Sequence, residues 1–365
     1  MQEKGRISTN QYIWLLFSII TSFSTLQIVG RLIEHAGRDA WLSAVIAWFV
    51  DIVLAVVYAY LGLRFPGQNM IEYSITILGK FWGKAVALLF LLFFLVSASA
   101  LLRSLCNLLN GDFFPTTPAN VLLFICFALV GIGARKGLEV FARTSELLGP
   151  LYLLSFIILF SLAVPLCHFQ NLKPQLYQGI MPSLTGAPFL LSFISICIIM
   201  GMFIPYCNEP ANGFIGKVIA VTVGSAMFEF LVIFGISIFG AEQAGNVVNV
   251  GLALARIIGL GGTLQRLESI WLVVSVAAAV MSGISLIWAF SLGISQIAGL
   301  QTYRPLVYPS ALLAFIVTVT SFETSNDVNL FANYVFPFIA LFVESGLGLF
   351  LLVMALLRKK RGTPG

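Results

Sequence analysis

The sequence predicts an all-α polytopic membrane protein with about ten membrane-spanning helices, and two observations support that prediction. Hydrophobic residues make up 59% of the 365 positions and charged residues only 10%, with a mean hydropathy of +0.99, whereas a soluble domain carries about 25% charged residues. The charges are also clustered, because five long stretches contain no Asp, Glu, Lys or Arg: 7–30, 113–134, 147–172, 174–208 and 269–303. A spanning helix needs about 20 mostly apolar residues, so each stretch can hold at least one.

The spans follow from the apolar runs and their boundaries at charged, Pro and Gly residues. The first run is too long for the core of a signal peptide and lacks a convincing cleavage site, so we expect it to remain as the first helix. The stretch 245–260 is apolar but short and holds Asn246, Asn249 and Arg256, which favours an interfacial or re-entrant helix. The predicted spans lie near 9–30, 40–62, 84–107, 119–134, 147–167, 187–206, 217–240, 269–290, 305–321 and 331–357.

The distribution of basic residues predicts the orientation of the chain. With ten spans both termini lie on the same side of the membrane. If that side is cytoplasmic, 14 of the 20 Lys and Arg residues fall in cytoplasmic segments and five fall outside. This split follows the positive-inside rule, whereas an eleventh span would put the basic C-terminal end outside. We therefore expect both termini in the cytoplasm.

Ten spans divide into five plus five, which is the arithmetic of an inverted repeat with its substrate site near the midplane. We expect one integral membrane domain over 1–365, with repeats at about 7–168 and 183–357 and a basic cytoplasmic tail at 358–365. The first helix of each half should be interrupted. The first span carries TSFST (21–25) at its middle, and the sixth carries Ser192, Ser195, Cys197 and Gly201.

The polar group Thr21, Phe23, Ser24 and Thr25 leaves two interpretations open. The hydroxyls could bond back to carbonyls of the preceding turn, or allow tight helix contacts, and so be structural. Alternatively, the helix breaks here and its freed amides and hydroxyls meet a small ligand, with the positive helix end favouring a carboxylate.

Four charged residues lie within predicted spans: Asp51, Arg103, Glu229 and Glu344. Charge inside a membrane is costly, so such groups face protein or a water-filled cavity. For the three acids we expect structural hydrogen bonds or ion pairs, with proton coupling as the alternative. Arg103 can extend to the outer headgroups, pair within the protein or line a cavity, and it can pair with Glu344 only if the fold brings them together.

Several function classes find no support in the sequence. The five cysteines form no CxxC pair and there are only two histidines, which argues against a disulfide framework or a Cys/His metal site. GIGARKG (131–137) matches neither dinucleotide nor P-loop spacing, and no catalytic motif stands in a loop large enough for a domain. We expect no enzyme, no cofactor and no nucleic-acid partner.

Four segments go beyond composition: EHAGRDAWLS (34–43), RFPGQNMIEY (64–73), GLEVFARTSELLGPL (137–151) and QRLESIWL (265–272). Together they resemble the B subunits of spore germinant receptors, the GerAB-type membrane proteins. That family is similar in fold to the amino acid–polyamine–organocation transporters, which have the LeuT-like five-plus-five inverted repeat. The resemblance extends over nearly the whole chain.

The resemblance implies a small-molecule site between helices 1, 3, 6 and 8 and a role in sensing nutrient germinants, commonly amino acids, in the spore inner membrane. It also implies partnership with an A subunit and a lipoprotein C subunit. The ligand-facing breaks would lie at Phe23–Thr25 and near Cys197–Gly201. Arg103 matches a basic position on helix 3, and the resemblance assigns structural motifs to Gly37, Arg38, Asp39, Arg266 and Glu268.

Two departures from the family pattern concern the site itself. Many relatives have glycines in the helix 1 break, where this chain has Phe23, Ser24 and Thr25. Some carry a glutamate in helix 6 where this chain has Ile199. The leading hypothesis is a receptor subunit that binds a germinant, and its alternatives are an amino acid or amine permease and a scaffold that binds nothing.

Overall fold

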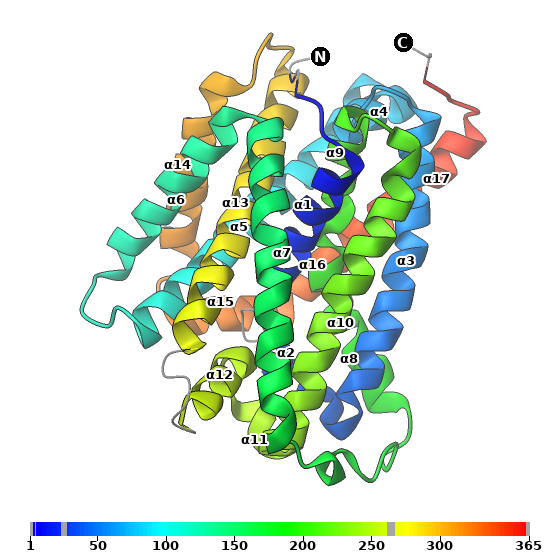
Figure 1. The fold of residues 1–365 in the computed structure, drawn as a ribbon. Coiled ribbons are helices and arrows are strands. Elements are labelled where there is room, and N and C mark those ends of the chain that lie inside the picture. Colours follow the sequence, from blue (N-terminus) through cyan, green and yellow to red (C-terminus); the bar gives the residue numbers. More distant parts are fainter. Residues whose placement is uncertain (1–2, 4, 23–27, 261–266, 363–365) are drawn as a thin grey trace.

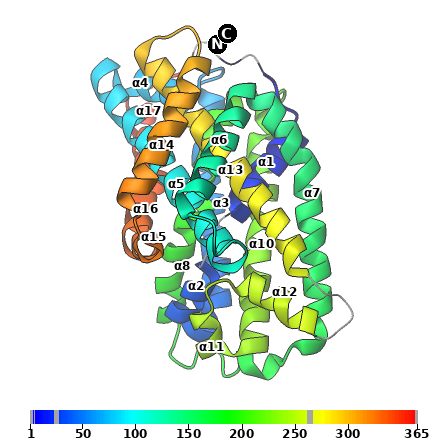
Figure 2. The same ribbon diagram turned by 90° about the vertical axis from the view of Figure 1, so that its left-hand side faces the viewer.

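A computed structural model describes residues 3, 5–22, 28–260 and 267–362. Its regular secondary structure is helical throughout these residues, apart from one isolated bridge between Ile7 and Cys207. Figure 1 shows a bundle of long helices with both chain ends at the top, which we call the termini end; the opposite end is the far end. Figure 2 shows α7 on one side of the bundle and the last spans on the other.

The described residues of the first half form seven α-helices and three short 3₁₀ turns before residue 181. Up to α7 they are α1 (Thr9–Ser22), α2 (Ile28–Ala36), the 3₁₀ turn Gly37–Asp39, α3 (Ala40–Arg64), α4 (Met70–Leu78), α5 (Lys80–Asp112), α6 (Ala119–Lys136) and α7 (Leu138–Ala163). Short 3₁₀ turns at Val164–Leu166 and Phe169–Leu172 follow α7. The predicted span near 40–62 is longer in the structure, since α2, the 3₁₀ turn and α3 run on from one another.

The second half is more interrupted. Its helices are α8 (Met181–Ile194), α9 (Met200–Phe203), α10 (Gly213–Phe239), α11 (Ala241–Asn246), α12 (Val250–Leu260), α13 (Leu267–Ala298), α14 (Val307–Ser321), α15 (Ser325–Leu330), α16 (Phe336–Leu341) and α17 (Gly348–Leu357). A 3₁₀ segment, Ser195–Ile199, separates α8 from α9. Two π-helical segments, Phe331–Val335 and Phe342–Leu347, flank α16 within the last span.

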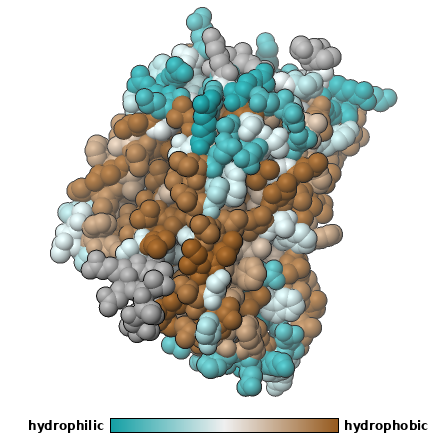
Figure 3. Space-filling view, viewed as in Figure 1, coloured by the Kyte–Doolittle hydropathy of each residue, from teal (hydrophilic) through white to brown (hydrophobic). Residues whose placement is uncertain are grey.

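The surface of the molecule is that of a membrane protein. Nine helical segments of the described chain are long and apolar enough to cross a bilayer, and α1, with 14 residues, precedes the first of them. Large apolar side chains such as Phe49, Phe124 and Ile157 are exposed on these helices. Figure 3 shows them as a hydrophobic band between hydrophilic ends. The short helices α11 and α12 lie at the far end, where the sequence predicted an interfacial or re-entrant segment (Figure 1).

Helix α1 lies in the core against α7, α10 and α13. Two glycines of α10 allow close approach: a methyl group at Gly216 would lie 2.8 Å from the ring of Tyr12, and one at Gly224 would lie 2.8 Å from Ile20. Small residues serve this purpose in membrane bundles because they let helix backbones pack closely. These two glycines therefore allow α1 and α10 to pack closely at two positions along their length.

The N-terminal segment is fastened across the termini end. The N–H of Ile7 donates to the carbonyl of Tyr206 (3.0 Å), and the N–H of Asn208 donates to the carbonyl of Ile7 (2.9 Å). Arg6 adds a hydrogen bond to the carbonyl of Pro205 (3.0 Å). The segment before α1 thus bridges to the end of the sixth span.

Glu3 also fastens the N-terminal segment to the rest of the bundle. Its buried carboxylate accepts hydrogen bonds from the Tyr303 hydroxyl (2.6 Å), the Gly5 N–H (2.8 Å), the Trp288 indole (3.2 Å) and the Leu138 N–H (3.3 Å). Burial raises the pKa of Glu3, but these four donors outweigh burial and hold the pKa below its usual value. One carboxylate therefore ties the N-terminus to α7, α13 and the loop after α13.

The Gly37–Arg38–Asp39 motif makes the corresponding connection at the far end. Gly37 has a φ of +60°, which glycine adopts without the steric cost of a Cβ atom. The Asp39 carboxylate accepts from the Leu176 N–H (2.9 and 3.0 Å), and Arg38 donates to the Lys173 carbonyl. The turn between the first two spans thus anchors the loop that precedes α8.

Candidate functional site

The sixth span is interrupted where the sequence suggested. Between α8 and α9 the chain forms the 3₁₀ segment Ser195–Ile199, whose hydrogen-bonding pattern differs from that of an α-helix. In the first span, α1 ends at Ser22 and α2 begins at Ile28. The predicted ligand-facing residues Phe23, Ser24 and Thr25 lie outside the described residues.

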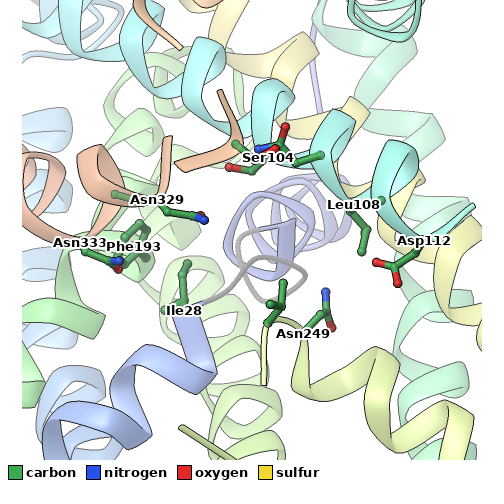
Figure 4. Close-up of a pocket in the computed structure, with 13 residues that line it drawn as sticks. Ile28, Ser104, Leu108, Asp112, Phe193, Asn249, Asn329 and Asn333 are labelled. Atoms are coloured by element: carbon green, nitrogen blue, oxygen red, sulfur yellow. The ribbon is translucent and has the colours of Figure 1, made fainter. Parts of the chain in front are cut away.

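A cavity of about 340 Å³, lined by both polar and apolar residues, lies toward the far end of the bundle. Figure 4 shows Asn329 and Asn333 on one side of it and Asn249 and Asp112 on the other. Four asparagines, two serines and one aspartate provide its polar surface. The described residues that line it are Ile28, Ser104, Asn107, Leu108, Gly111, Asp112, Phe193, Val248, Asn249, Ser325, Asn329, Ala332 and Asn333. Its volume lies at the small end of the range for small-molecule sites, about 300–1,000 Å³.

The described residues that the sequence singled out as ligand-binding do not line this cavity. The Thr21 hydroxyl donates to the Phe17 carbonyl (2.7 Å), which is the back-bonding interpretation. The Cys197 thiol lies 3.8 Å from the Leu16 carbonyl, and Gly201 packs beside Met70. Cys197 therefore contacts α1, Gly201 packs on α4, and the Ser195 hydroxyl bonds to Asp51 on α3.

Sequence reasoning missed the asparagines that supply most of the cavity's polar groups. Asn329 and Asn333 are four residues apart on the last span, and this spacing places them on one helical face. A polar pair at that spacing, with Asn333 inside the predicted span near 331–357 and Asn329 just before it, was the available signal. Asn249 belonged to a segment expected to be interfacial or re-entrant.

A second polar cluster lies inside the bundle, away from the cavity. The Lys217 ammonium on α10 lies 3.1 Å from Oδ1 of Asp51 on α3, and both side chains are fully buried. The Ser195 hydroxyl donates to the same Oδ1 at 2.9 Å. Asp51 therefore joins α3, α10 and the 3₁₀ interruption of the sixth span.

The structure corrects the assignment of Lys217, which the sequence-based topology placed in a cytoplasmic segment. It is the fifth residue of α10, close enough to the predicted span boundary to look like a flanking cation. Its side chain is instead completely buried and pairs with Asp51. An acid on another helix compensates its charge, and such partners are not visible in the local sequence.

Glu344 is the third charged group of this region. It is fully buried in the π-helical segment Phe342–Leu347, and neither carboxyl oxygen has a hydrogen-bond partner among the described residues. Asp51 and Lys217 are close enough to act on it electrostatically. The predicted alternative, a pair with Arg103, is not formed: Arg103 donates to the Glu323 carbonyl (2.9 Å).

The remaining described residues that the sequence analysis singled out lie outside the buried charge cluster. Glu229 is half-buried on α10. Glu268, at the start of α13, accepts from Arg256 of α12 (2.9 Å), and Arg256 also pairs with Asp112 (3.0 Å) on the rim of the cavity. Arg256 therefore holds α12 beside the cavity. Arg266 lies outside the described residues.

Two aromatic rings connect the cavity to the buried charges. Phe193 lines the cavity and stacks on Phe336, with ring centroids 5.0 Å apart at 24°. Phe193 lies two residues before Ser195, and Phe336 starts α16, the helix that leads into the Glu344 segment. The cavity wall and the charge cluster thus share the sixth span and the last span.

Solved structures with the same overall fold are secondary transporters. A Na⁺-coupled sialic acid symporter in a substrate-bound outward-open state superimposes with a TM-score of 0.66 at 12% identity, covering 98% of this chain and 92% of the symporter. MhsT in complex with L-phenylalanine gives 0.65 at 13% identity, covering 96% of each chain. At these identities the likeness shows the fold, which is the predicted LeuT-like arrangement.

Curated relatives share nearly the full length of the chain. Spore germination protein YndE of Bacillus subtilis (strain 168) is 25% identical over 363 residues, covering 98% of both chains. Spore germination protein KB of the same organism is 25% identical over 364 residues, covering 98% of this chain and 97% of the relative. A family model described as "Spore germination protein" matches residues 6–328, and the chain therefore belongs to the spore germination protein family of membrane proteins.

Proposed function

We infer that this protein is the membrane subunit of a spore germinant receptor and that it binds a small, amino-acid-like germinant in the cavity lined by the four asparagines. The single observation that carries this inference is the lining of the cavity, in which side-chain amides and hydroxyls outnumber charges. Family membership supports the germination role, and the transporter fold supports a ligand site between interrupted helices.

The chemistry of the lining favours a ligand without net charge. An asparagine amide offers two donors and an acceptor, so it can bind either end of a zwitterion. The one acid in the lining, Asp112, is already paired with Arg256. The Asn249 side-chain oxygen accepts from the Leu252 N–H at the start of α12, which leaves Asn107, Asn329 and Asn333 as the main recognition groups.

Substitution of cavity asparagines tests the inference in spores. Loss of one hydrogen bond costs about 0.5–1.5 kcal/mol, so Asn333→Ala should raise the germinant concentration for half-maximal response by roughly two- to tenfold at unchanged protein level. Asn326→Ala is the matched control, because Asn326 is exposed on the same span and does not line the cavity. Equal responses in the two variants would contradict the proposed site.

Deletion of the gene tests the role itself. Spores that lack the protein, in a strain without redundant receptors, should fail to respond to at least one nutrient in a panel. A normal response to every nutrient would refute the receptor function. Co-purification of A- and C-type subunits with this chain from spore inner membranes would test the expected partners and location.

The expected orientation also belongs to this proposal. Both chain ends lie at one end of the bundle (Figure 1), and we place that end in the cytoplasm because most basic residues lie there in the predicted topology. The cavity then opens outward, where a nutrient arrives. Protease protection of a C-terminal tag in inverted and right-side-out vesicles measures this orientation.

A second candidate function is an amino acid or amine permease. The fully buried pair of Asp51 and Lys217 favours it, since charged groups inside a bundle mark ion pathways in transporters. Uptake of labelled amino acids into proteoliposomes above the level of empty liposomes would favour transport over sensing.

A further inference from the structure

We propose that Glu344 is a proton-binding site, protonated in the conformation described here, whose proton balances the charge of the buried cluster that it forms with Asp51 and Lys217. The site lies apart from the ligand cavity and does not depend on the proposed function, because it would serve a receptor or a permease equally.

The first step is the environment of the Glu344 carboxyl. The side chain is fully buried, and no described residue donates a hydrogen bond to either oxygen. The nearby Tyr58 hydroxyl is occupied, because it donates to the backbone carbonyl of Glu344 (2.7 Å). A buried carboxylate without partners costs so much free energy that such groups take up a proton instead.

The second step is the charge of the cluster. Asp51 and Lys217 form a 3.1 Å pair and cancel one another, so an ionised Glu344 would leave one uncompensated negative charge within the bundle. One proton on Glu344 makes the cluster neutral. The Lys217 ammonium and the Ser195 hydroxyl both use Oδ1 of Asp51, while Oδ2 of Asp51 has no partner among the described residues.

The titratable groups that interact electrostatically with Glu344 come from three elements. α3 contributes Asp51 and the neutral Tyr58, α10 contributes Lys217, and the 3₁₀ interruption contributes the thiol of Cys197. α5 also packs against this segment, but its buried cation Arg103 donates to the Glu323 carbonyl instead. Lys217 is thus the one cation among the described groups that act on Glu344.

A proton fits this site better than a metal ion. A hard cation in a protein is held by a shell of about six or more oxygens. The cluster offers three carboxyl oxygens without partners, from Asp51 and Glu344, and the fixed ammonium of Lys217 already supplies positive charge beside them. A proton needs one oxygen only.

The position of the cluster gives the proton a structural consequence. Ser195 begins the 3₁₀ interruption and bonds to Asp51, and Glu344 follows α16 on the span that carries Asn333 of the cavity. Loss of the proton would put a second negative charge beside Lys217, and the Lys217 ammonium would then be shared between Asp51 and Glu344. Deprotonation of Glu344 would therefore change the interactions of Asp51, which accepts the hydrogen bond from Ser195.

Infrared difference spectroscopy on the purified full-length protein in lipid nanodiscs tests the site without any ligand. The C=O stretching band of a protonated carboxyl should persist in the wild-type spectrum from about pH 5 to pH 9, where exposed carboxyls are ionised. It should shift in D₂O and appear in the difference between the wild-type and Glu344→Gln spectra. Glu344→Gln should remove this band. Glu229→Gln is the matched control, because Glu229 is a half-buried acid of a neighbouring span, and it should retain the band.

A second variant separates loss of the site from loss of the fold. In the double variant Asp51→Asn/Lys217→Met, Glu344 remains but its charged neighbours are gone, so its band should persist at a shifted frequency. A band that survives Glu344→Gln in folded protein would overturn the proposal. So would a band that stays unmoved in the double variant, or one that disappears on addition of Na⁺ at constant pH, which would indicate a sodium site.

Discussion

The buried pair of Lys217 and Asp51 gives the sharpest quantitative prediction. Its atoms lie 3.1 Å apart and both side chains have no solvent exposure, so neither charge has water as an alternative partner. Removing one partner of such a pair leaves an uncompensated buried charge and costs about 3–5 kcal/mol, whereas replacing both with uncharged side chains of similar size is often nearly neutral. Lys217→Met and Asp51→Asn keep the shape of each side chain.

We therefore expect each single variant to lose about 3–5 kcal/mol of unfolding free energy, and the double variant to lose far less than their sum. Lys217→Met should be the worse of the two, because it leaves Asp51 facing Glu344 without a cation. If the double variant is nearly neutral, the coupling energy of the cycle approaches the sum of the two single losses, about 6–10 kcal/mol, which exceeds the usual values for residues in direct contact.

Reversible unfolding in mixed micelles, followed by circular dichroism, measures this cycle. The exposed pair Arg143–Glu139 on α7 is a suitable control, since its side chains are 67% and 44% exposed. Its coupling energy should stay below about 0.5 kcal/mol. If the Lys217–Asp51 coupling is as small as the control, or the double variant is no more stable than the worse single variant, the reasoning is wrong.

Three further predictions concern other parts of the molecule. Glu3→Gln should lower the melting temperature at about pH 7. The difference in melting temperature from wild type should shrink as the pH falls below the usual carboxyl pKa, because Glu3, with its lowered pKa, stabilises the fold only while it is ionised. Thermal melts across a range of pH measure this difference. Gly83→Ala should destabilise the protein by about 1–3 kcal/mol, since the added methyl would overlap the backbone of Ile75; micelle unfolding checks this. Arg256→Ala should change global stability by less than about 1 kcal/mol but speed amide exchange in α12, because it releases Asp112 from that helix.

The sequence was sufficient for the membrane architecture because the relevant signal is local. Stretches without charge mark the spans, and the small and polar residues Ser192, Ser195, Cys197 and Gly201 marked the interruption of the sixth span at Ser195–Ile199. Both chain ends lie at one end of the bundle, as an even number of spans requires, and their cytoplasmic orientation stays a prediction. The limits of the two repeats stay a prediction.

The site was harder to predict because it depends on distances between helices. Lys217 looked like a flanking cation, since nothing near it in sequence reveals Asp51 on α3. The sequence analysis emphasised hydroxyls, whereas most polar residues of the cavity are asparagines, which come from three separate parts of the chain: α5, the loop before α12 and the last span. Thr21 uses its hydroxyl within its own helix, and the ligand role of Phe23–Thr25 remains a prediction.

The two π-helical segments of the last span have a consequence for how this helix can change in length. A π turn holds an extra residue, so each segment is equivalent to a one-residue insertion that the helix has absorbed locally. Each residue of an α-helix turns the chain by about 100°, so a deletion elsewhere would rotate the buried face of α17, formed by Gly348, Leu351 and Ala355, out of the core. A deletion within either π segment would instead restore regular helix and leave that face in place. The last span can therefore lose a residue without rotating its end at the two π segments, one beside Asn333 and the other beside Glu344.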